Sequence, residues 1–238
     1  MALPLNTTPV YNLTIPSNGE KVRYRPFLIK EQKALLLAQQ SEDPSVMVDT
    51  LKSIIKSCVT DDIDVDKLAM FDLEYIFIKL RAKSVGEVVE LIMVCDEDHG
   101  EQDNKAKVKI DINLDQLEVQ RQEGHSNKID LFGDVGVVMK YPSFSTLNKF
   151  KSVNDSDAAF DVVAESIDYI YNSDEVFYAK DQTRKDLSEF IDNLTSDQFN
   201  KLQQFFATMP KLSKQVDYKC PVCGKEHKVM LEGVESFF

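Results

Sequence analysis

The chain has 238 residues, and its 28 Lys and Arg against 40 Asp and Glu give a formal net charge of −12 at pH 7. No dense run of Lys or Arg supplies the basic surface that displaces counterions from phosphates, which argues against nucleic acid as a partner. The composition is that of an ordinary globular protein, and no apolar run is long enough to cross a bilayer. Four cysteines are too few and too unevenly spaced for a secreted disulfide scaffold, and the first residues lack the pattern of a signal peptide. We therefore expect a protein of the reducing cytosol that binds neither nucleic acid nor membrane.

The first 84 residues are expected to form a β-arm followed by three helices. Four prolines exclude a helix from the first 29 residues, and alternating apolar residues on both sides of Ser17-Asn18-Gly19 predict a β-hairpin. A helix is expected over residues 30–40. A second is expected from Asp43-Pro44, where a capping side chain precedes a proline that needs no N–H partner. A third is expected over roughly residues 65–80.

A basic segment, Arg81 to Glu87, joins the third helix to the β-rich middle of the chain. Cationic side chains near a helix C-terminus suit the helix dipole, and Gly86 is typical of a helix end. The alternative interpretation is a contact patch, because Arg81 and Lys83 stand out on an acidic protein. Both interpretations stay open.

The middle third of the chain is predicted to be mainly β-structure. Residues 87–95 form a β-run, residues 96–104 a polar turn, and the apolar residues of 106–112 alternate with polar ones. This pattern predicts a hairpin with Cys95 at its tip. Further strands are expected at 117–119, 128–132 and 135–141.

From Ser143 the pattern favours helices again. One expected helical face is made by Phe160, Val163, Ile167, Ile170 and Tyr171. Thr195, with Gln198 three residues later, has the capping-box spacing that begins a helix. Pro210 ends this helix.

The C-terminal segment contains Cys220-Pro221-Val222-Cys223-Gly224 between two strand-like stretches. A C-x2-C pair at a tight turn is typical of a zinc knuckle, which supplies two of the four ligands of a tetrahedral site. Cys95 and His99 on the first hairpin could complete a Cys3His site, with His227 as the alternative fourth ligand. The other hypothesis is a metal-free pair of hairpins held by β-packing alone.

Little in the sequence supports catalysis. The three histidines lie in polar turns or hairpins, and the chain has neither a nucleophile elbow nor a glycine-rich phosphate loop. The Cys220–Cys223 pair could be a redox dithiol, but such pairs usually lie where a strand meets a helix N-terminus, and here strand is expected on both sides. We therefore expect no enzyme activity. The rival hypotheses are a zinc-ribbon adaptor that acts on nucleic acid and, less favoured, a thiol-redox protein.

Four segments define an order along the chain: Tyr24-Arg25-Pro26-Phe27-Leu28-Ile29-Lys30-Glu31-Gln32-Lys33, Arg81–Glu87, Met139-Lys140-Tyr141-Pro142, and the Cys-x2-Cys hairpin ending in Gly233 and Phe237-Phe238. In this order they resemble the T4-like bacteriophage baseplate hub proteins, the hub subunits and hub-assembly factors of contractile tails. The resemblance spans nearly the whole chain and depends on order and spacing, since none of the motifs is specific by itself. Family members often have a fuller cysteine set on the first hairpin than Cys95 with His99.

The resemblance implies a non-enzymatic structural or assembly protein, chaperone-like, that works with other hub and tail proteins in the host cytoplasm or within the virion tail baseplate. We expect an α+β fold in which helical segments flank a β-hairpin region, with a zinc-ribbon-like C-terminal hairpin beside the first cysteine-tipped hairpin. The expected segments, interleaved in one globular unit, are 1–84, 85–142, 143–212 and 213–238. Short strands with free edges suit contacts with other proteins. The candidate contact residues are Tyr11, Leu13, Arg81, Lys83, Phe237 and Phe238.

Overall fold

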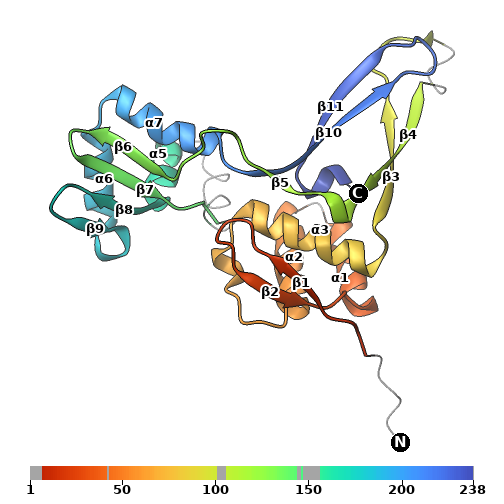
Figure 1. Ribbon diagram of the computed structural model, residues 1–238, viewed down its shortest axis with the longest axis horizontal. Helices are drawn as coiled ribbons and strands as arrows, with labels where there is room; N and C mark the ends of the chain where they lie inside the picture. The colour runs from red at the N-terminus through yellow and green to blue at the C-terminus, as the bar shows by residue number, and fades with distance from the viewer. Residues whose placement is uncertain (1–6, 42, 101–105, 144–145, 147–155, 238) are drawn as a thin grey trace, which may run out of the picture. The chain divides into compact units, whose positions relative to one another are not determined.

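The structure is a computed structural model that describes residues 7–41, 43–100, 106–143, 146 and 156–237. Its helices and small antiparallel sheets confirm the predicted α+β class (Figure 1). None of the helices within these residues combines the length and the apolar character that a membrane span requires. The chain divides into two compact units: unit 1 consists of 1–65, 71–120 and 211–238, and unit 2 of 66–70 and 121–210. The expected division into four segments stays a prediction.

The N-terminal hairpin of unit 1 consists of β1 (Tyr11–Thr14) and β2 (Lys21–Tyr24), paired antiparallel with Tyr11 opposite Tyr24. The turn between them places Gly19 at a φ of 74°, a conformation that glycine adopts without steric cost. Ile15 and Val22 are almost completely buried. The predicted hairpin is confirmed, and its apolar side belongs to the core of unit 1.

Three helices come next along the chain: α1 (Ile29–Gln39), α2 (Pro44–Cys58) and α3 (Met70–Ser84). The predicted start of α2 is confirmed, because the Asp43 side chain accepts a hydrogen bond from the Ser45 N–H at 2.9 Å. The third helix begins later and ends later than predicted. Residues Val65–Lys67 form a separate 3-10 turn before it, and its last turn contains Arg81 and Lys83, as expected for a helix C-terminus.

Helix α3 is buried on nearly all sides, so its apolar residues do not form a single stripe. Its residue Lys79 is only 7% exposed. The Lys79 Nζ donates hydrogen bonds to the backbone oxygens of Asp115 and Leu117, at 2.6 and 2.9 Å. This helix therefore holds the loop that comes after the first cysteine hairpin.

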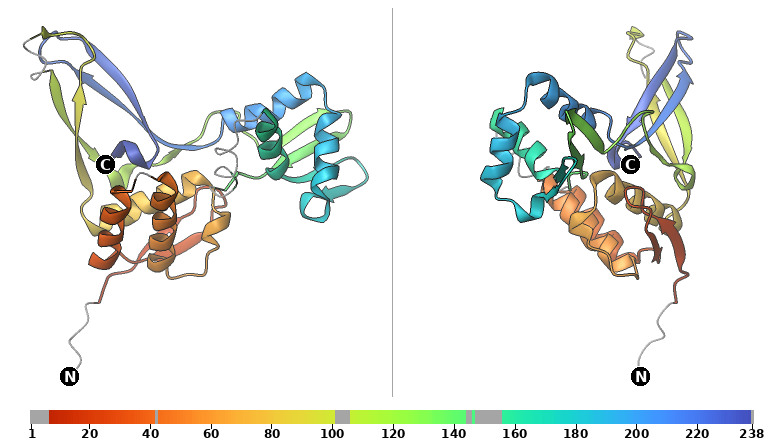
Figure 2. Two further views of the ribbon diagram at one scale, coloured as in Figure 1. Left: turned by 180° about the vertical axis from the view of Figure 1, so that it is seen from behind. Right: turned by 60° about the vertical axis from the view of Figure 1, so that its left-hand side comes forward.

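The two long hairpins of unit 1 reach in the same direction, and their tips lie side by side in the views of Figures 1 and 2. The first pairs β3 with β4 over seven residues, and the second pairs β10 with β11 over seven residues. A short strand, β5, pairs with the start of β10, giving the sheet order β11-β10-β5. The strands are β3 (Val88–Val94), β4 (Lys107–Asn113), β5 (Val119–Gln120), β10 (Lys211–Lys219) and β11 (Glu226–Glu232).

Unit 2 contains an antiparallel sheet of order β6-β7-β8-β9 and the helices α5, α6 and α7. Side chains from the sheet and from all three helices meet in one apolar core, which includes Val137, Ile167 and Leu202 without any exposed surface. The elements are β6 (Lys128–Phe132), β7 (Val135–Met139), α5 (Ser156–Glu165), β8 (Ile167–Tyr171), β9 (Val176–Tyr178), α6 (Arg184–Asp192) and α7 (Ser196–Ala207).

The helical face expected from Phe160 to Tyr171 is wrong beyond Glu165. Helix α5 ends there, and Ile167 begins strand β8, which pairs with β7 and β9. Ile167 lies four residues after Val163 and so fits a helical spacing, but the segment after Ser166 is rich in β-branched and aromatic residues that favour a strand. The predicted capping box is confirmed, with Thr195 preceding α7.

Candidate metal centre

The turn between β10 and β11 is a tight knuckle that presents two thiols from one short segment. The Cys220 N–H donates to the Lys225 carbonyl at 2.8 Å, and the Gly224 N–H donates to the Cys220 carbonyl at 3.0 Å. Gly224 has a φ of 76°, which only glycine adopts readily. The Val222 N–H points at the Cys220 sulfur, 3.4 Å away. The local sequence thus folds Cys220 and Cys223 toward one point, as predicted.

The tip of the first hairpin supplies the other two predicted ligands. Cys95 directly follows β3, and its N–H donates to the Ala106 carbonyl at 3.0 Å, which closes the hairpin. His99 lies farther along the loop, where its Nδ1 is 2.5 Å from the Glu97 carbonyl oxygen. This contact orients the ring so that the His99 Nε2 faces the knuckle.

The structure brings Cys95, His99, Cys220 and Cys223 together, close enough to hold a metal ion. Their ligand atoms all lie within 4.8 Å of one another. The sulfurs of Cys95 and Cys223 are 4.0 Å apart, and the His99 Nε2 is 3.4 Å from the Cys220 sulfur. In a tetrahedral zinc site, Zn–S and Zn–N bonds of about 2.3 and 2.0 Å imply ligand separations of roughly 3.5–3.8 Å. The observed arrangement therefore fits a tetrahedral Cys3His site.

Other contacts hold the two hairpin tips against each other. The Tyr218 hydroxyl on β10 donates to the Val94 carbonyl on β3 at 2.8 Å. Lys225 forms an ion pair with Glu97 across the tips. The apolar contribution is small, because the buried cluster at the tips contains only Cys95, Ala106 and Cys220, with Val222 packed against it. Among the described residues, the tips therefore have little hydrophobic surface to bury besides the side chains of the ligands.

The thiols of the site differ in the direction in which their pKa values are shifted. Desolvation acts to raise the pKa of the Cys220 thiol, but backbone hydrogen bonds from Cys223 and Val222 outweigh it and lower this pKa to about 6. Desolvation raises the pKa of Cys95. The neighbouring Cys223 side chain raises the pKa of His99 to about 9. The lowered Cys220 pKa favours the thiolate, which is the form that binds a metal, whereas the raised His99 pKa means that metal binding there releases a proton.

His227, the predicted alternative ligand, also lies at the site. Its Nε2 is 3.2 Å from the Cys95 sulfur, and its Nδ1 is 3.6 Å from the Asp96 carboxylate. Cys95, Asp96 and His227 form a second close group of metal-ligating side chains. Asp96 is not among the ligands predicted from the sequence, although its position next to Cys95 at a hairpin tip could have identified it as a potential ligand.

The candidate partner-contact residues lie in different environments. Tyr11 and Arg81 are half-buried, and Leu13 is 8% exposed. The Lys83 Nζ is paired with Glu87 at 2.6 Å and with Asp115 at 3.1 Å.

Of the two C-terminal phenylalanines, the structure describes only Phe237. Phe237 has no exposed surface and packs on the body of unit 1. Phe238 lies outside the described residues. Partner contact by any of the six candidate residues stays a prediction.

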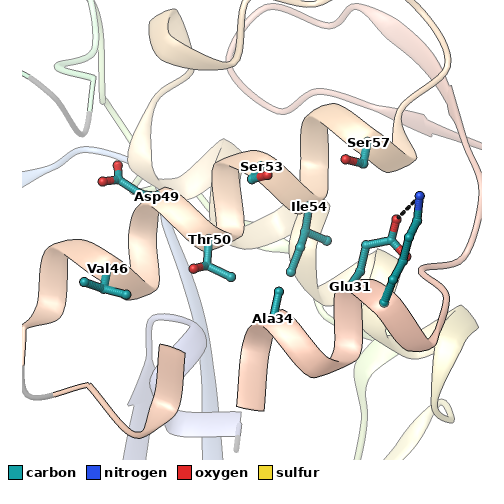
Figure 3. A pocket seen from close by; sticks show the side chains of 9 residues that line it. Glu31, Ala34, Val46, Asp49, Thr50, Ser53, Ile54 and Ser57 are labelled. Atoms are coloured by element: carbon teal, nitrogen blue, oxygen red, sulfur yellow. Dashed lines mark ion pairs between the residues drawn. The ribbon is translucent and has the colours of Figure 1, made fainter. Parts of the chain in front are cut away.

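A shallow groove of about 480 Å³ lies between α1 and α2 (Figure 3). Lys30 forms an ion pair with Glu31 at 3.4 Å, whereas Asp49 lies away from Glu31 along the groove (Figure 3). Glu31 is already engaged by Arg25 at 2.9 Å and by the Leu28 N–H at 2.8 Å, so it caps α1. The groove is therefore a gap between two helices rather than a set of reacting groups.

Comparison with known proteins places the chain beside phage tail proteins over nearly its whole length. Residues 8–238 match the family model described as T4 bacteriophage base plate protein. The baseplate hub assembly protein gp26 of Enterobacteria phage T4 is 25% identical over 231 residues, covering 96% of this chain and 97% of that protein. No solved structure gives a significant match.

Proposed function

Because the chain belongs to the T4 bacteriophage base plate protein family, we propose that it helps to build the hub of a contractile-tail baseplate. It does so through contacts with other hub and tail proteins and without catalysing a reaction. The observation that carries this proposal is the end-to-end similarity to a protein named for hub assembly. The protein acts in the host cytoplasm during assembly, and a chain that stays in the particle is located on the virion tail baseplate.

The surface of the chain offers features suited to such contacts. Helix α1 leaves three large apolar side chains in solvent, with Ile29, Leu36 and Leu37 between 54% and 69% exposed. Strand β9 is an edge strand whose residues Val176 to Tyr178 are all exposed. Free strand edges and exposed apolar side chains are the usual material of protein interfaces. The predicted contacts through Tyr11, Arg81 and Lys83 belong to the same proposal.

The test is an affinity purification of the tagged chain from infected cells, analysed by mass spectrometry against a tag-only control. We expect baseplate hub and tail proteins to be enriched. An immunoblot of purified particles, run in parallel, separates a resident hub subunit from an assembly factor that leaves. A chain that enriches no tail protein, and whose deletion leaves infectious tails intact, would contradict the proposal.

We also propose that one structural zinc ion joins the two hairpin tips through the candidate metal centre. The supporting observation is the set of four ligand atoms within 4.8 Å on segments more than 120 residues apart in sequence. Structural zinc sites are closed and contribute directly to folding. Elemental analysis of protein purified without chelators should give one zinc per chain. A metal-free, fully folded protein with free thiols would support the alternative of hairpins held by packing alone.

A further inference from the structure

We infer that His99 is the fourth zinc ligand, and that His227 acts from outside the coordination sphere as a hydrogen-bond donor to the Cys95 sulfur. This inference rests on the zinc proposed above and assigns separate roles to the two histidines. It also gives Tyr218 a purpose, because this residue holds the His227 ring.

The contacts of His99 are those of a zinc-ligating histidine. Its Nδ1 faces the Glu97 carbonyl oxygen at 2.5 Å, and a carbonyl can only accept, so Nδ1 carries the hydrogen. In the neutral ring, which is the form that ligates a metal, the Nε2 lone pair then points toward the thiols, 3.4 Å from the Cys220 sulfur. Ligating histidines usually donate their other ring N–H to a carbonyl or carboxylate, which fixes the tautomer and the ring orientation.

His227 is held in place by groups that are not ligands. It lies directly opposite Tyr218 in the β10–β11 register. The two rings are stacked, with centroids 4.7 Å apart and an interplanar angle of 10°. The Tyr218 hydroxyl is itself anchored on the Val94 carbonyl. The stacked ring therefore keeps its Nε2 at 3.2 Å from the Cys95 sulfur.

The grouping of ligand atoms argues against His227 in the coordination sphere. The close group that contains His227 includes Cys95 and Asp96 but neither knuckle cysteine. Asp96 is 77% exposed, whereas the His227 side chain is 9% exposed. The group with His99 offers four ligand atoms, three of them thiols, and these are the ligands that structural zinc sites use. A single ion is therefore best satisfied by the His99 group, which leaves His227 beside it.

A donor at this position has a clear physical effect. Three thiolates and one neutral imidazole give a zinc centre with a net charge of −1, so excess negative charge remains on the sulfurs. With its ring hydrogen on Nε2, His227 donates to the Cys95 sulfur, which stabilises that charge and disfavours release of this ligand. Such outer-shell partners typically change metal affinity by about 10- to 100-fold when they are removed. His227 is thus a positioning residue for Cys95.

The experiment uses the full chain, reconstituted with Zn²⁺ or with Co²⁺ as a spectroscopic substitute, and the variants His99→Ala, His227→Ala, His227→Phe and His227→Gln. Lys228→Ala, at an exposed neighbour on β11, is the matched control. Metal content is measured by mass spectrometry, metal release by competition with a chromogenic chelator, and the ligand set by the cobalt absorption spectrum.

We expect every His227 variant to bind one metal with the three-thiolate, one-nitrogen cobalt spectrum. His227→Ala and His227→Phe should shift the thiolate-to-cobalt charge-transfer band and weaken binding by about 10- to 100-fold. The Phe variant keeps a ring against Tyr218, so its lower metal affinity reports the missing N–H rather than the missing ring stacking. His227→Gln keeps a donor and should recover part of the affinity. His99→Ala should lose the nitrogen ligand from the spectrum.

Two results would overturn the assignment in distinguishable ways. If the unmodified chain binds zinc but His227→Ala and His227→Phe match Lys228→Ala in affinity and spectrum, the inference fails while the zinc site stands. The inference also fails if His227→Ala loses the nitrogen ligand and His99→Ala keeps it, because the roles are then exchanged. If the unmodified chain binds no metal, the zinc proposal fails together with this inference, and the hub role is untouched.

Discussion

The two units of the molecule differ in what holds their interiors together. Unit 2 is almost one continuous segment, and its core consists of apolar side chains from neighbouring elements. Unit 1 joins three separated segments, and it contains the buried charged residues of the described chain, namely Glu31, Asp72 and Lys79. Its hairpin tips add the cluster of potential metal ligands.

The difference shows where directional contacts are needed. Apolar burial is non-directional and grows with area, so it suffices where short loops already bring the elements together. The segments of unit 1 are far apart in sequence, and hydrogen bonds to fixed backbone atoms join them. The Ser17 N–H donates to Asp72, 55 residues away, and the Tyr218 hydroxyl donates to Val94, 124 residues away. Each such contact favours one pairing of distant segments over a shifted one.

The largest effect is expected from a cavity in the apolar interior of unit 2. Leu202 on α7 has no exposed surface and lies in this core. Leu202→Ala should lower the free energy of unfolding of unit 2 by about 2–5 kcal/mol, because it removes buried apolar atoms and leaves a cavity. Native-state hydrogen exchange resolved by mass spectrometry measures this unit separately.

The exposed neighbour Gln203 provides the control, and Gln203→Ala should stay within about 0.5 kcal/mol of the unmodified chain. Amides of the hairpin tips should keep their protection in Leu202→Ala. Equal loss of protection in both units would show that the two interiors do not act independently.

The second-largest loss of stability should come from removing the buried Lys79 ammonium of unit 1. Lys79→Met keeps much of the apolar stem but removes the ammonium that binds the carbonyls of Asp115 and Leu117. Leaving these acceptors without their donor should cost about 1–3 kcal/mol. The measurement is the free energy of unfolding in urea, with Lys33→Met on the exposed side of α1 as the control. A Lys79→Met chain as stable as the control would mean that these two hydrogen bonds make no net contribution to the free energy of unfolding.

Much of the fold can be predicted from local patterns in the sequence. The N-terminal hairpin, the Asp43-Pro44 start of α2, the first cysteine hairpin and the Thr195 cap all depend on residues close to one another in sequence, and the structure confirms them. The error at Ile167 has the same origin. Its spacing from Val163 fits a helix, but β-branched and aromatic residues together with pairing to β7, about 30 residues earlier, make the segment a strand.

The candidate metal centre likewise has a local part that the sequence predicts and a long-range part that it does not. The knuckle is visible in the sequence because Cys220 and Cys223 flank a turn with Pro221 and Gly224. That Cys95 and His99 face the knuckle depends on the approach of a hairpin more than 120 residues away. The role of Tyr218 beside His227 depends on ring stacking and register, which no sequence spacing specifies.

The third prediction concerns a carboxyl group that joins the C-terminal segment to α3. Desolvation raises the pKa of Glu74 to about 7, although the Val234 N–H donates to it, and the nearby Glu235 adds to the rise. The folded chain therefore binds this proton more tightly than the unfolded chain, whose group titrates near 4.5. Its contribution to stability is complete below about pH 4.5 and is lost as the pH rises toward 7.

Glu74→Gln removes this titration. Relative to the Gln variant, the unmodified chain should lose on the order of 2–3 kcal/mol of stability between pH 4.5 and 7. Urea unfolding of both chains across this range measures the difference. A difference between the two chains that is independent of pH would place the Glu74 pKa near its ordinary value.

The smallest effect should come from the cap of α7, a contact within a single turn of unit 2. The Thr195 hydroxyl accepts from the Gln198 N–H at 3.4 Å, and the Gln198 side chain accepts from the Thr195 N–H at 2.8 Å. Thr195→Ala leaves one helix N–H without its partner and should cost about 1 kcal/mol. Ser196→Ala, at the exposed next position, is the matched control, and thermal unfolding of both chains measures the difference. Because this cap joins residues of one turn only, the loss should be confined to unit 2 amides. Hydrogen exchange locates this loss. A comparable loss of protection at the hairpin tips would contradict the view that unit 2 is held by neighbouring elements and unit 1 by contacts between distant segments.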